Sequence, residues 1–141
     1  MAAFTLISDI AKGSIVILIT EKYYSEFVLM SFLIVYLGHI FPVWLKFKGG
    51  KGVATFIGGI LVVDHILCIV FLITWAAVVK VFKISSLSAI VAFIATLLVT
   101  FILYERNLIL LMFFFTIFSI YTHRDNITRI ISGEESKIKT K

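Results

Sequence analysis

Hydrophobic residues of this chain gather into long runs that are separated by short polar breaks. The runs cover residues 3–20, 27–45, 54–79, 87–103 and 107–122. A helix needs about 20 apolar residues to cross the hydrocarbon core of a bilayer. The pattern therefore predicts an all-α fold: a polytopic transmembrane helix bundle of five to six membrane segments, forming a single domain over residues 1–141.

The third run decides between five and six segments, because Asp64 and His65 interrupt its middle. Ionisable groups are costly in lipid. Either one long span carries a buried polar pair, or two shorter helices turn there. Residues 54–63 are short for a full crossing, since about ten helical residues rise only about 15 Å, so this part is expected to be partly re-entrant.

Basic residues follow the second, the third and the last apolar runs. They are Lys46, Lys48, Lys51, Lys80, Lys83, Arg124, Arg129, Lys137, Lys139 and Lys141. Lysine and arginine collect in cytoplasmic loops. If residues 54–79 cross twice, all three groups share one side of the membrane, so charge favours six segments.

Composition agrees with a membrane protein: 61% of the 141 residues are hydrophobic and 15% are charged. The net charge of +5 fits membrane orientation rather than nucleic-acid binding. Cys68 is the only cysteine, which excludes an intramolecular disulfide. The three histidines are far apart and form no metal-binding spacing, so we expect neither a metal nor another cofactor. Asp9 and Lys12 lie three residues apart and are expected to pair on one helix face.

A glycine-lysine turn follows the second run and carries the chemistry of a phosphate site. Lys48, Gly49, Gly50, Lys51 and Gly52 precede the next apolar helix. Glycines allow backbone N–H groups to converge on an anion, and a helix N-terminus favours negative charge. The spacing is not that of a nucleotide-binding P-loop.

The same turn has a plainer interpretation, a flexible basic cytoplasmic turn. His39 and Pro42 precede it and favour the functional reading, because a proline that breaks a helix frees backbone groups and aims the imidazole toward the loop. A histidine that merely ends a helix remains the alternative for His39.

A second polar group lies where the last span ends, over residues 122–135. If this segment is helical, His123 and Asn126 share a face, which places an acid-base side chain beside an amide able to bind an oxyanion or phosphate. The alternative is a basic stop-transfer flank, in which Arg124 and Arg129 contact anionic lipid head groups. Ser86 stands at a predicted helix start, where capping is the competing role.

These residues, in this order, resemble the bacterial acyl-phosphate:glycerol-3-phosphate acyltransferases. The resemblance rests on Gly38–Thr55 and on His123–Arg129 with Gly133 and Glu134, and it extends over essentially the whole chain. It implies a multi-pass enzyme of the bacterial inner membrane that moves a fatty acyl group from acyl phosphate to the 1-hydroxyl of sn-glycerol 3-phosphate. The product is lysophosphatidic acid, an intermediate of phospholipid biosynthesis, and the active-site loops face the cytoplasm.

The resemblance also assigns residues. His123 and Asn126 are the expected catalytic pair, and Glu134 is the expected structural carboxylate. The glycine-rich motif is expected to bind glycerol phosphate through Gly49, Gly50, Lys51 and Gly52. The polar residues discussed above complete the expected substrate-binding set: His39, Lys48, Ser86 and Arg124. Membrane lipids are the other expected partners.

One departure from the family pattern bears on activity. The family has a further N-terminal span and a polar loop rich in serine and arginine, and neither has a counterpart in this sequence. The alternative function is therefore a catalytically silent fragment of that enzyme. A transporter of a phosphorylated metabolite is a third hypothesis, suggested by the broken helices.

Overall fold

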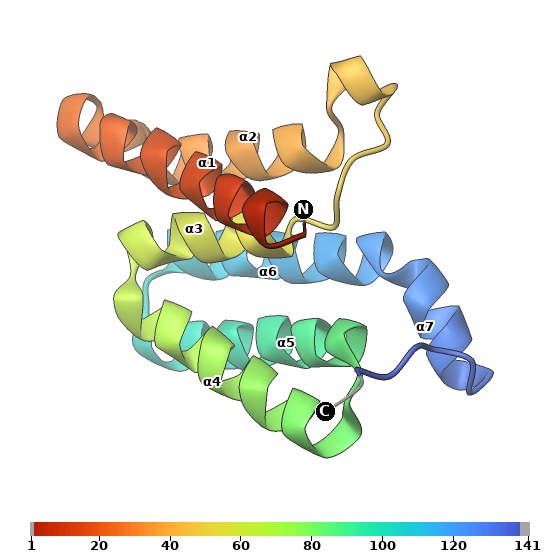
Figure 1. Ribbon diagram of the computed structural model, residues 1–141. Coiled ribbons are helices and arrows are strands. Elements are labelled where there is room, and N and C mark those ends of the chain that lie inside the picture. Colours follow the sequence, from red (N-terminus) through yellow and green to blue (C-terminus); the bar gives the residue numbers. More distant parts are fainter. Residues whose placement is uncertain (1, 139–141) are drawn as a thin grey trace. The chain divides into compact units, whose positions relative to one another are not determined.

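The computed structural model describes residues 2–138, with side chains from residue 4 onward. The chain divides into two compact units, residues 1–68 and 69–141, and each unit is described by itself. The elements in chain order are α1 (Ala2–Tyr23), η1 (Ser25–Phe27), α2 (Val28–Ile40), η2 (Val43–Leu45), α3 (Val53–Val63), α4 (His65–Phe82), α5 (Ser85–Leu103), α6 (Arg106–Thr122) and α7 (Arg124–Ile131). Every one of these elements is helical, and the predicted all-α fold is confirmed (Figure 1).

Three segments of the described chain are long and apolar enough to cross a membrane: Ser25–Leu45, His65–Phe82 and Ser85–Leu103. A fourth is added if the bent pair α6 and α7 forms one span. Helix α3 is apolar but short, with 11 residues. The polytopic helical architecture predicted from the apolar runs is therefore present, and its segments differ widely in length.

The third apolar run is broken at Asp64, as the second of the two sequence interpretations requires. Helix α3 ends at Val63, and Asp64 adopts an extended conformation with φ −159° and ψ 109°. Its carboxylate oxygen Oδ1 accepts a hydrogen bond of 2.8 Å from the Leu67 N–H. A side chain that caps the first turn of a helix in this way starts a new helix, so Asp64 begins α4 rather than lying buried in one long span.

In the first unit, α1 packs closely against α3 through small residues. The hydroxyl of Ser14 donates to the Gly58 carbonyl oxygen at 2.9 Å. A Cβ on Gly13 would overlap the Thr55 carbonyl oxygen, and one on Gly58 would overlap that of Ile10. Glycine at these positions lets the two helix backbones touch, which is the usual way helices associate in lipid. Asp9 and Lys12 on α1 pair at 3.4 Å, as predicted.

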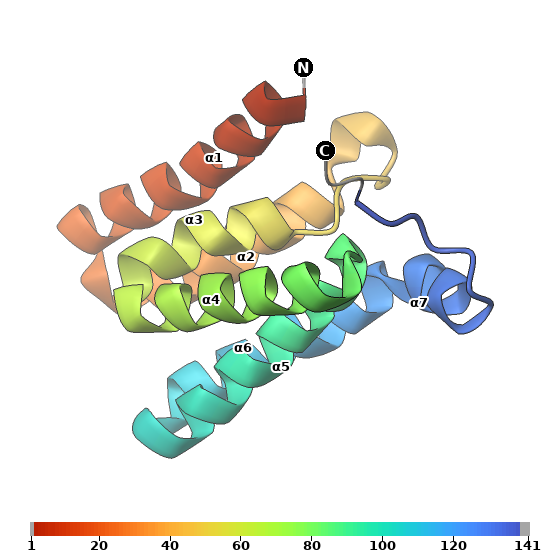
Figure 2. The ribbon, with the colours of Figure 1, turned by 60° about the horizontal axis from the view of Figure 1, so that its bottom comes forward.

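In the second unit, α5 and α6 lie side by side (Figure 2). The Phe71 ring of α4 meets the Phe93 ring of α5 edge to face, with 5.0 Å between centroids. The Thr116 hydroxyl of α6 donates to the Phe93 carbonyl oxygen at 3.4 Å. The chain bends by 59° between α6 and α7, and His123 stands at that bend. The bend carries the last polar segment back toward the start of α5, which α7 contacts.

Candidate functional site

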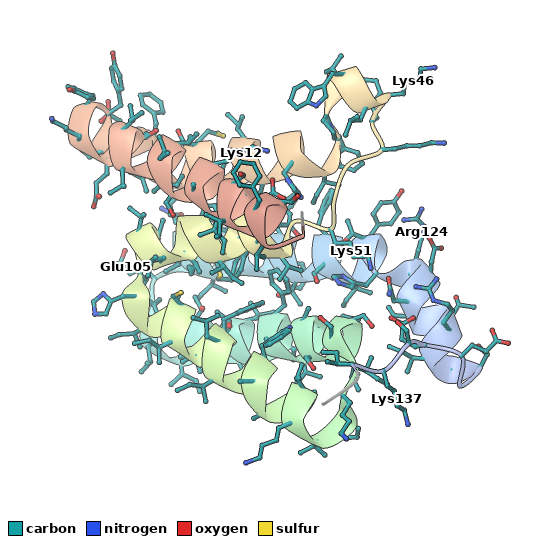
Figure 3. All side chains as sticks on the ribbon, in the orientation of Figure 1. Lys12, Lys46, Lys51, Glu105, Arg124 and Lys137 are labelled. Atoms are coloured by element: carbon teal, nitrogen blue, oxygen red, sulfur yellow. The ribbon has the colours of Figure 1, made fainter. Side chains whose placement is uncertain are left out.

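The glycine-lysine loop, residues 48–52, belongs to the first unit and joins the end of α2 to α3. The chain leaves α2 after Ile40 and makes the short turn η2 beyond Pro42, and Lys46 follows this turn near its protruding tip (Figure 3). Lys46 and Phe47 both have positive φ, 50° and 61°, so the chain reverses sharply there. This reversal brings the glycines back onto the end of α2.

Main-chain hydrogen bonds fix the first part of the loop. The Gly49 N–H donates to the Ile40 carbonyl oxygen at 3.0 Å, and the Gly50 N–H donates to the His39 carbonyl oxygen at 3.3 Å. The last carbonyls of a helix lack partners within the helix, and here the loop supplies them. These two N–H groups therefore point at α2, and the expectation that they converge on an anion is wrong.

Three glycines of the loop touch α2 too closely for any side chain. A Cβ on Gly49 would overlap the His39 carbonyl oxygen, and it would lie 2.5 Å from the Pro42 Cδ. A Cβ on Gly50 would overlap the His39 ring nitrogen Nε2, and a Cβ on Gly52 would overlap the Tyr36 ring. The glycines thus serve close packing, and within residues 49–52 only Lys51 carries a side chain.

The start of α3 is the part of this region suited to an anion. Gly52 has φ +84° and immediately precedes Val53, the first residue of α3. The first-turn N–H groups of a helix lack partners within it and carry the positive end of its dipole. Lys51 lies two residues before the helix (Figure 3), so its positive charge adds to that of the helix end.

His39 connects this loop to α1. Its Nδ1 lies 3.4 Å from the Asp9 Oδ1, and the His39 side chain is 12% exposed. The first unit therefore brings together His39, Gly49, Gly50 and Gly52 from the predicted set. Lys48 is exposed and its N–H donates to the Leu45 carbonyl oxygen at 3.1 Å.

In the second unit, the carboxylate of Glu135 accepts hydrogen bonds from three side chains, one at the start of α5 and two in α7. Glu135 Oε1 accepts from the Ser86 hydroxyl and from the Asn126 amide, each at 2.6 Å. Its Oε2 accepts from Arg129 Nε at 2.7 Å. The Ser86 and Asn126 hydrogen bonds, with a smaller contribution from Arg129, lower the pKa of Glu135 to about 2, although burial acts in the opposite direction. This set, Ser86, Asn126, Arg129 and Glu135, is called the Glu135 cluster below.

The hydrogen bonds of the Glu135 cluster give the structural role to Glu135 and not to Glu134, the residue predicted from the sequence. Glu134 was expected in that role, but the one hydrogen bond found for its side chain in the described chain comes from the Ser132 hydroxyl at 3.2 Å. Two adjacent glutamates offered no local signal to choose between them. Only the turn after α7, with φ +76° at Gly133, decides which carboxylate faces Asn126.

His123 lies at the end of α6, buried to 2% exposure. Its Nδ1 is 2.8 Å from the Ser119 carbonyl oxygen. A carbonyl accepts hydrogen bonds only, so Nδ1 carries a proton, and in the neutral form of the ring the lone pair is at Nε2. This tautomer suits a base that accepts a proton from a hydroxyl at Nε2.

The other predicted residues of the second unit are placed as follows. Ser86 does not cap α5, because its hydroxyl donates its hydrogen bond to Glu135 Oε1. Arg124 is exposed; its Nη1 donates to the Tyr121 carbonyl oxygen at 3.1 Å and its guanidinium lies over the Tyr121 ring. The second unit thus brings Ser86 and Asn126 together, and Asn126 lies three residues after His123, while Arg124 turns back onto Tyr121 at the end of α6. Among residues 2–138, no group of three or more histidine, cysteine, aspartate or glutamate side chains could hold a metal ion.

Comparison with known proteins gives a consistent result. The sequence model of the family described as glycerol-3-phosphate acyltransferase matches residues 1–133. Among curated relatives, the glycerol-3-phosphate acyltransferase of Ehrlichia canis is 41% identical over 98% of this chain and 73% of its own length. That of Ruthia magnifica is 42% identical over 97% of this chain and 71% of its own length.

Solved structures agree with the sequence matches. The crystal structure of PlsY, an integral membrane glycerol 3-phosphate acyltransferase, in its glycerol 3-phosphate form has a TM-score of 0.91 and 32% identity, over 98% of this chain and 71% of that one. Its lysophosphatidic acid form has a TM-score of 0.90 at the same identity, over 98% of this chain and 72% of that one.

Proposed function

Because this chain belongs to the glycerol-3-phosphate acyltransferase family, we propose that it transfers a fatty acyl group from acyl phosphate to the 1-hydroxyl of sn-glycerol 3-phosphate. The donor is a mixed anhydride with a good leaving group, so positioning supplies much of the acceleration and no covalent enzyme intermediate is needed. The hydroxyl oxygen bonds to the acyl carbon, the bond from that carbon to the phosphate oxygen breaks, and inorganic phosphate leaves. The product is lysophosphatidic acid.

The observation that carries the proposal is the state of His123 beside the Glu135 cluster. Its Nδ1–H is held by the Ser119 carbonyl oxygen, so Nε2 is the nitrogen able to take the proton of the attacking hydroxyl. Asn126, three residues further along the same polar segment, is fixed by Glu135 and offers its amide to phosphate or to the tetrahedral oxyanion. Substrate phosphate is the other candidate proton acceptor.

Binding of the glycerol phosphate is assigned to the glycine-lysine loop. Lys51 and the first-turn N–H groups of α3 bind the phosphate, since a helix N-terminus beside a lysine is a ready anion site. The proposal requires both Lys51 and His123 for turnover. It also places the enzyme in the bacterial inner membrane with these loops on the cytoplasmic side, where Arg124 contacts anionic lipid head groups.

Activity in membranes that contain the chain tests the proposal. Acyl phosphate and labelled glycerol 3-phosphate should yield labelled lysophosphatidic acid, and Lys51→Ala or His123→Ala should lower the rate about 100-fold or more. Lys46→Ala, a cation in the neighbouring turn, and His65→Ala, a histidine at the start of α4, are matched controls that should retain activity. A wild-type chain that binds glycerol 3-phosphate without turnover would instead support the silent-fragment alternative.

The proposed placement of both residues on the cytoplasmic side has its own test. In a Cys68→Ser background, Lys51→Cys and His123→Cys should both react with a thiol reagent that reaches only the cytoplasmic side. Labelling of the two cysteines from opposite sides of the membrane would rule out this placement.

A further inference from the structure

The ring of His39 lies between a carboxylate of α1 and the glycine-lysine loop. Its Nδ1 is 3.4 Å from the Asp9 Oδ1, and the same oxygen is 3.4 Å from the Lys12 Nζ. Its other nitrogen, Nε2, faces Gly50 so closely that a Cβ there would overlap it. One imidazole thus touches α1 on one side and the loop on the other.

The contact with Gly50 is made twice, by the side chain and by the main chain of the same histidine. The Gly50 N–H donates to the His39 carbonyl oxygen at 3.3 Å, while the ring covers the Gly50 Cα. Lys51 follows directly, so the backbone at Gly50 sets where the Lys51 side chain starts. A change in the tilt of the His39 ring would therefore shift the Gly50 backbone, from which the Lys51 side chain follows.

Asp9 is the group that fixes this tilt. Its side chain is 19% exposed and that of His39 is 12% exposed, so both lie mostly out of water, where a carboxylate needs partners. A carboxylate that faces one ring nitrogen of a histidine orients the ring and holds the proton on that nitrogen. Asp9 belongs to a different helix from His39, so the orientation depends on the packing of α1 against α2.

We propose that Asp9 and His39 are positioning residues for Lys51. Asp9 holds the His39 ring, the ring holds Gly50, and Gly50 sets the place of the Lys51 ammonium against the phosphate of the substrate. The inference rests on the proposed function only in giving Lys51 a phosphate to bind. It assigns His39 an action through the loop, where sequence reasoning expected a direct contact with substrate.

Kinetics give the first test. Asp9→Asn and His39→Ala should each raise the KM for glycerol 3-phosphate about fivefold or more, while kcat falls by less. The double variant should be no worse than His39→Ala alone, because Asp9 acts through His39. Glu21→Gln, an acidic residue of the same helix α1, is the control and should leave both constants unchanged. Additive effects of the two single variants would overturn the proposal.

A labelling experiment tests the same inference without using activity. In the Cys68→Ser background, the reaction of Lys51→Cys with a water-soluble thiol reagent should change at least threefold when Asp9→Asn or His39→Ala is added, and should not change with Glu21→Gln. An altered labelling rate in a chain without turnover would keep the positioning role and reject the acyltransferase activity. Unaltered labelling, in a chain whose activity depends on Lys51, would reject the positioning role alone.

A loss of activity that a second substitution restores is not due to misfolding, and such a pair of substitutions exists at Gly50 and His39. Gly50→Ala should lower activity about tenfold or more, because the added methyl overlaps the His39 ring. His39→Ala removes that ring, so it should restore activity at least threefold in the Gly50→Ala background. Gly49→Ala is the matched control, since its methyl meets main-chain carbonyls and Pro42, and His39→Ala should not rescue it. Equal failure to rescue at both glycines would contradict the contact on which the proposal depends.

Discussion

The glycine-lysine loop and the Glu135 cluster hold their functional side chains by different physical means. In the loop, glycines press against the end of α2, and two main-chain hydrogen bonds complete the contact. In the cluster, three side chains converge on one carboxylate. The loop depends on the absence of side-chain volume at its glycines, and the cluster depends on the negative charge of Glu135.

This difference predicts opposite sensitivities. A methyl group added to a loop glycine is enough to displace the loop. The main-chain hydrogen bonds of the loop involve no titrating group, so a change of charge should not affect them. The Glu135 cluster should be disturbed when one carboxylate oxygen of Glu135 is replaced, even if the new side chain has the same shape. Variants chosen to separate volume from charge will therefore break or sharpen the comparison.

The largest effect is expected for volume added to the loop. Gly49→Ala places a methyl group against two main-chain carbonyls and the Pro42 ring, none of which is a flexible side chain, so acyltransferase activity should fall about 100-fold or more. Gly38→Ala is the matched control, because a Cβ there meets nothing within 4 Å. Initial rates in membranes, normalised to the amount of protein, measure both. Equal activity of the two variants would contradict the steric account of the loop.

A smaller loss is expected when charge is removed from the cluster. Glu135→Gln keeps the shape of the side chain but replaces an oxygen acceptor with an amide donor, which opposes the N–H of Asn126 or Arg129. Activity should fall about tenfold, because Asn126 is no longer fixed. Glu134→Gln, one residue earlier, should leave the rate within a factor of two. If Glu134→Gln is the more damaging change, the structural role returns to the residue that sequence reasoning chose.

The cluster should also make stability depend on pH. The pKa of Glu135 is about 2, below its usual 4.5. The stabilisation that this shift represents is complete above about pH 4.5 and is lost as the pH falls toward 2, where the folded chain must also bind the proton. The difference in Tm between wild type and Glu135→Gln in detergent should therefore be a few degrees at pH 6 and should shrink steadily below pH 4.5. A difference that stays constant down to pH 3 would argue against an ionised Glu135.

The smallest effect is expected at Thr55, beside the loop in α3. Its hydroxyl is buried, and no hydrogen-bond partner for it exists among the described residues. Replacing such a group with an apolar one of the same shape removes a desolvation cost and little else. Thr55→Val should thus change the free energy of unfolding by less than about 1 kcal/mol, in either direction, as measured by thermal or denaturant unfolding in detergent. A marked loss of stability or activity would mean that this hydroxyl has a partner in the working enzyme.

The sequence alone determined the helical class and the family, and it favoured the break at Asp64. Apolar runs and their polar interruptions are properties of local sequence, because bilayer thickness sets the length of a span and ionisable groups are costly in lipid. The motifs around Lys51 and His123 were equally local. The family they indicated is confirmed by relatives that match almost the whole chain. The roles of the individual site residues stay predictions.

Tertiary structure decided which groups of distant segments contact one another, and neither composition nor residue spacing determines such contacts. It turned the Gly49 and Gly50 N–H groups toward α2, although their sequence suggested an anion cradle. It chose Glu135 over Glu134, and it brought Asp9 within reach of His39, 30 positions later in the chain. Each of these outcomes depends on where two backbone segments meet, and such contacts arise from the packing of whole helices rather than from the residues next to the site.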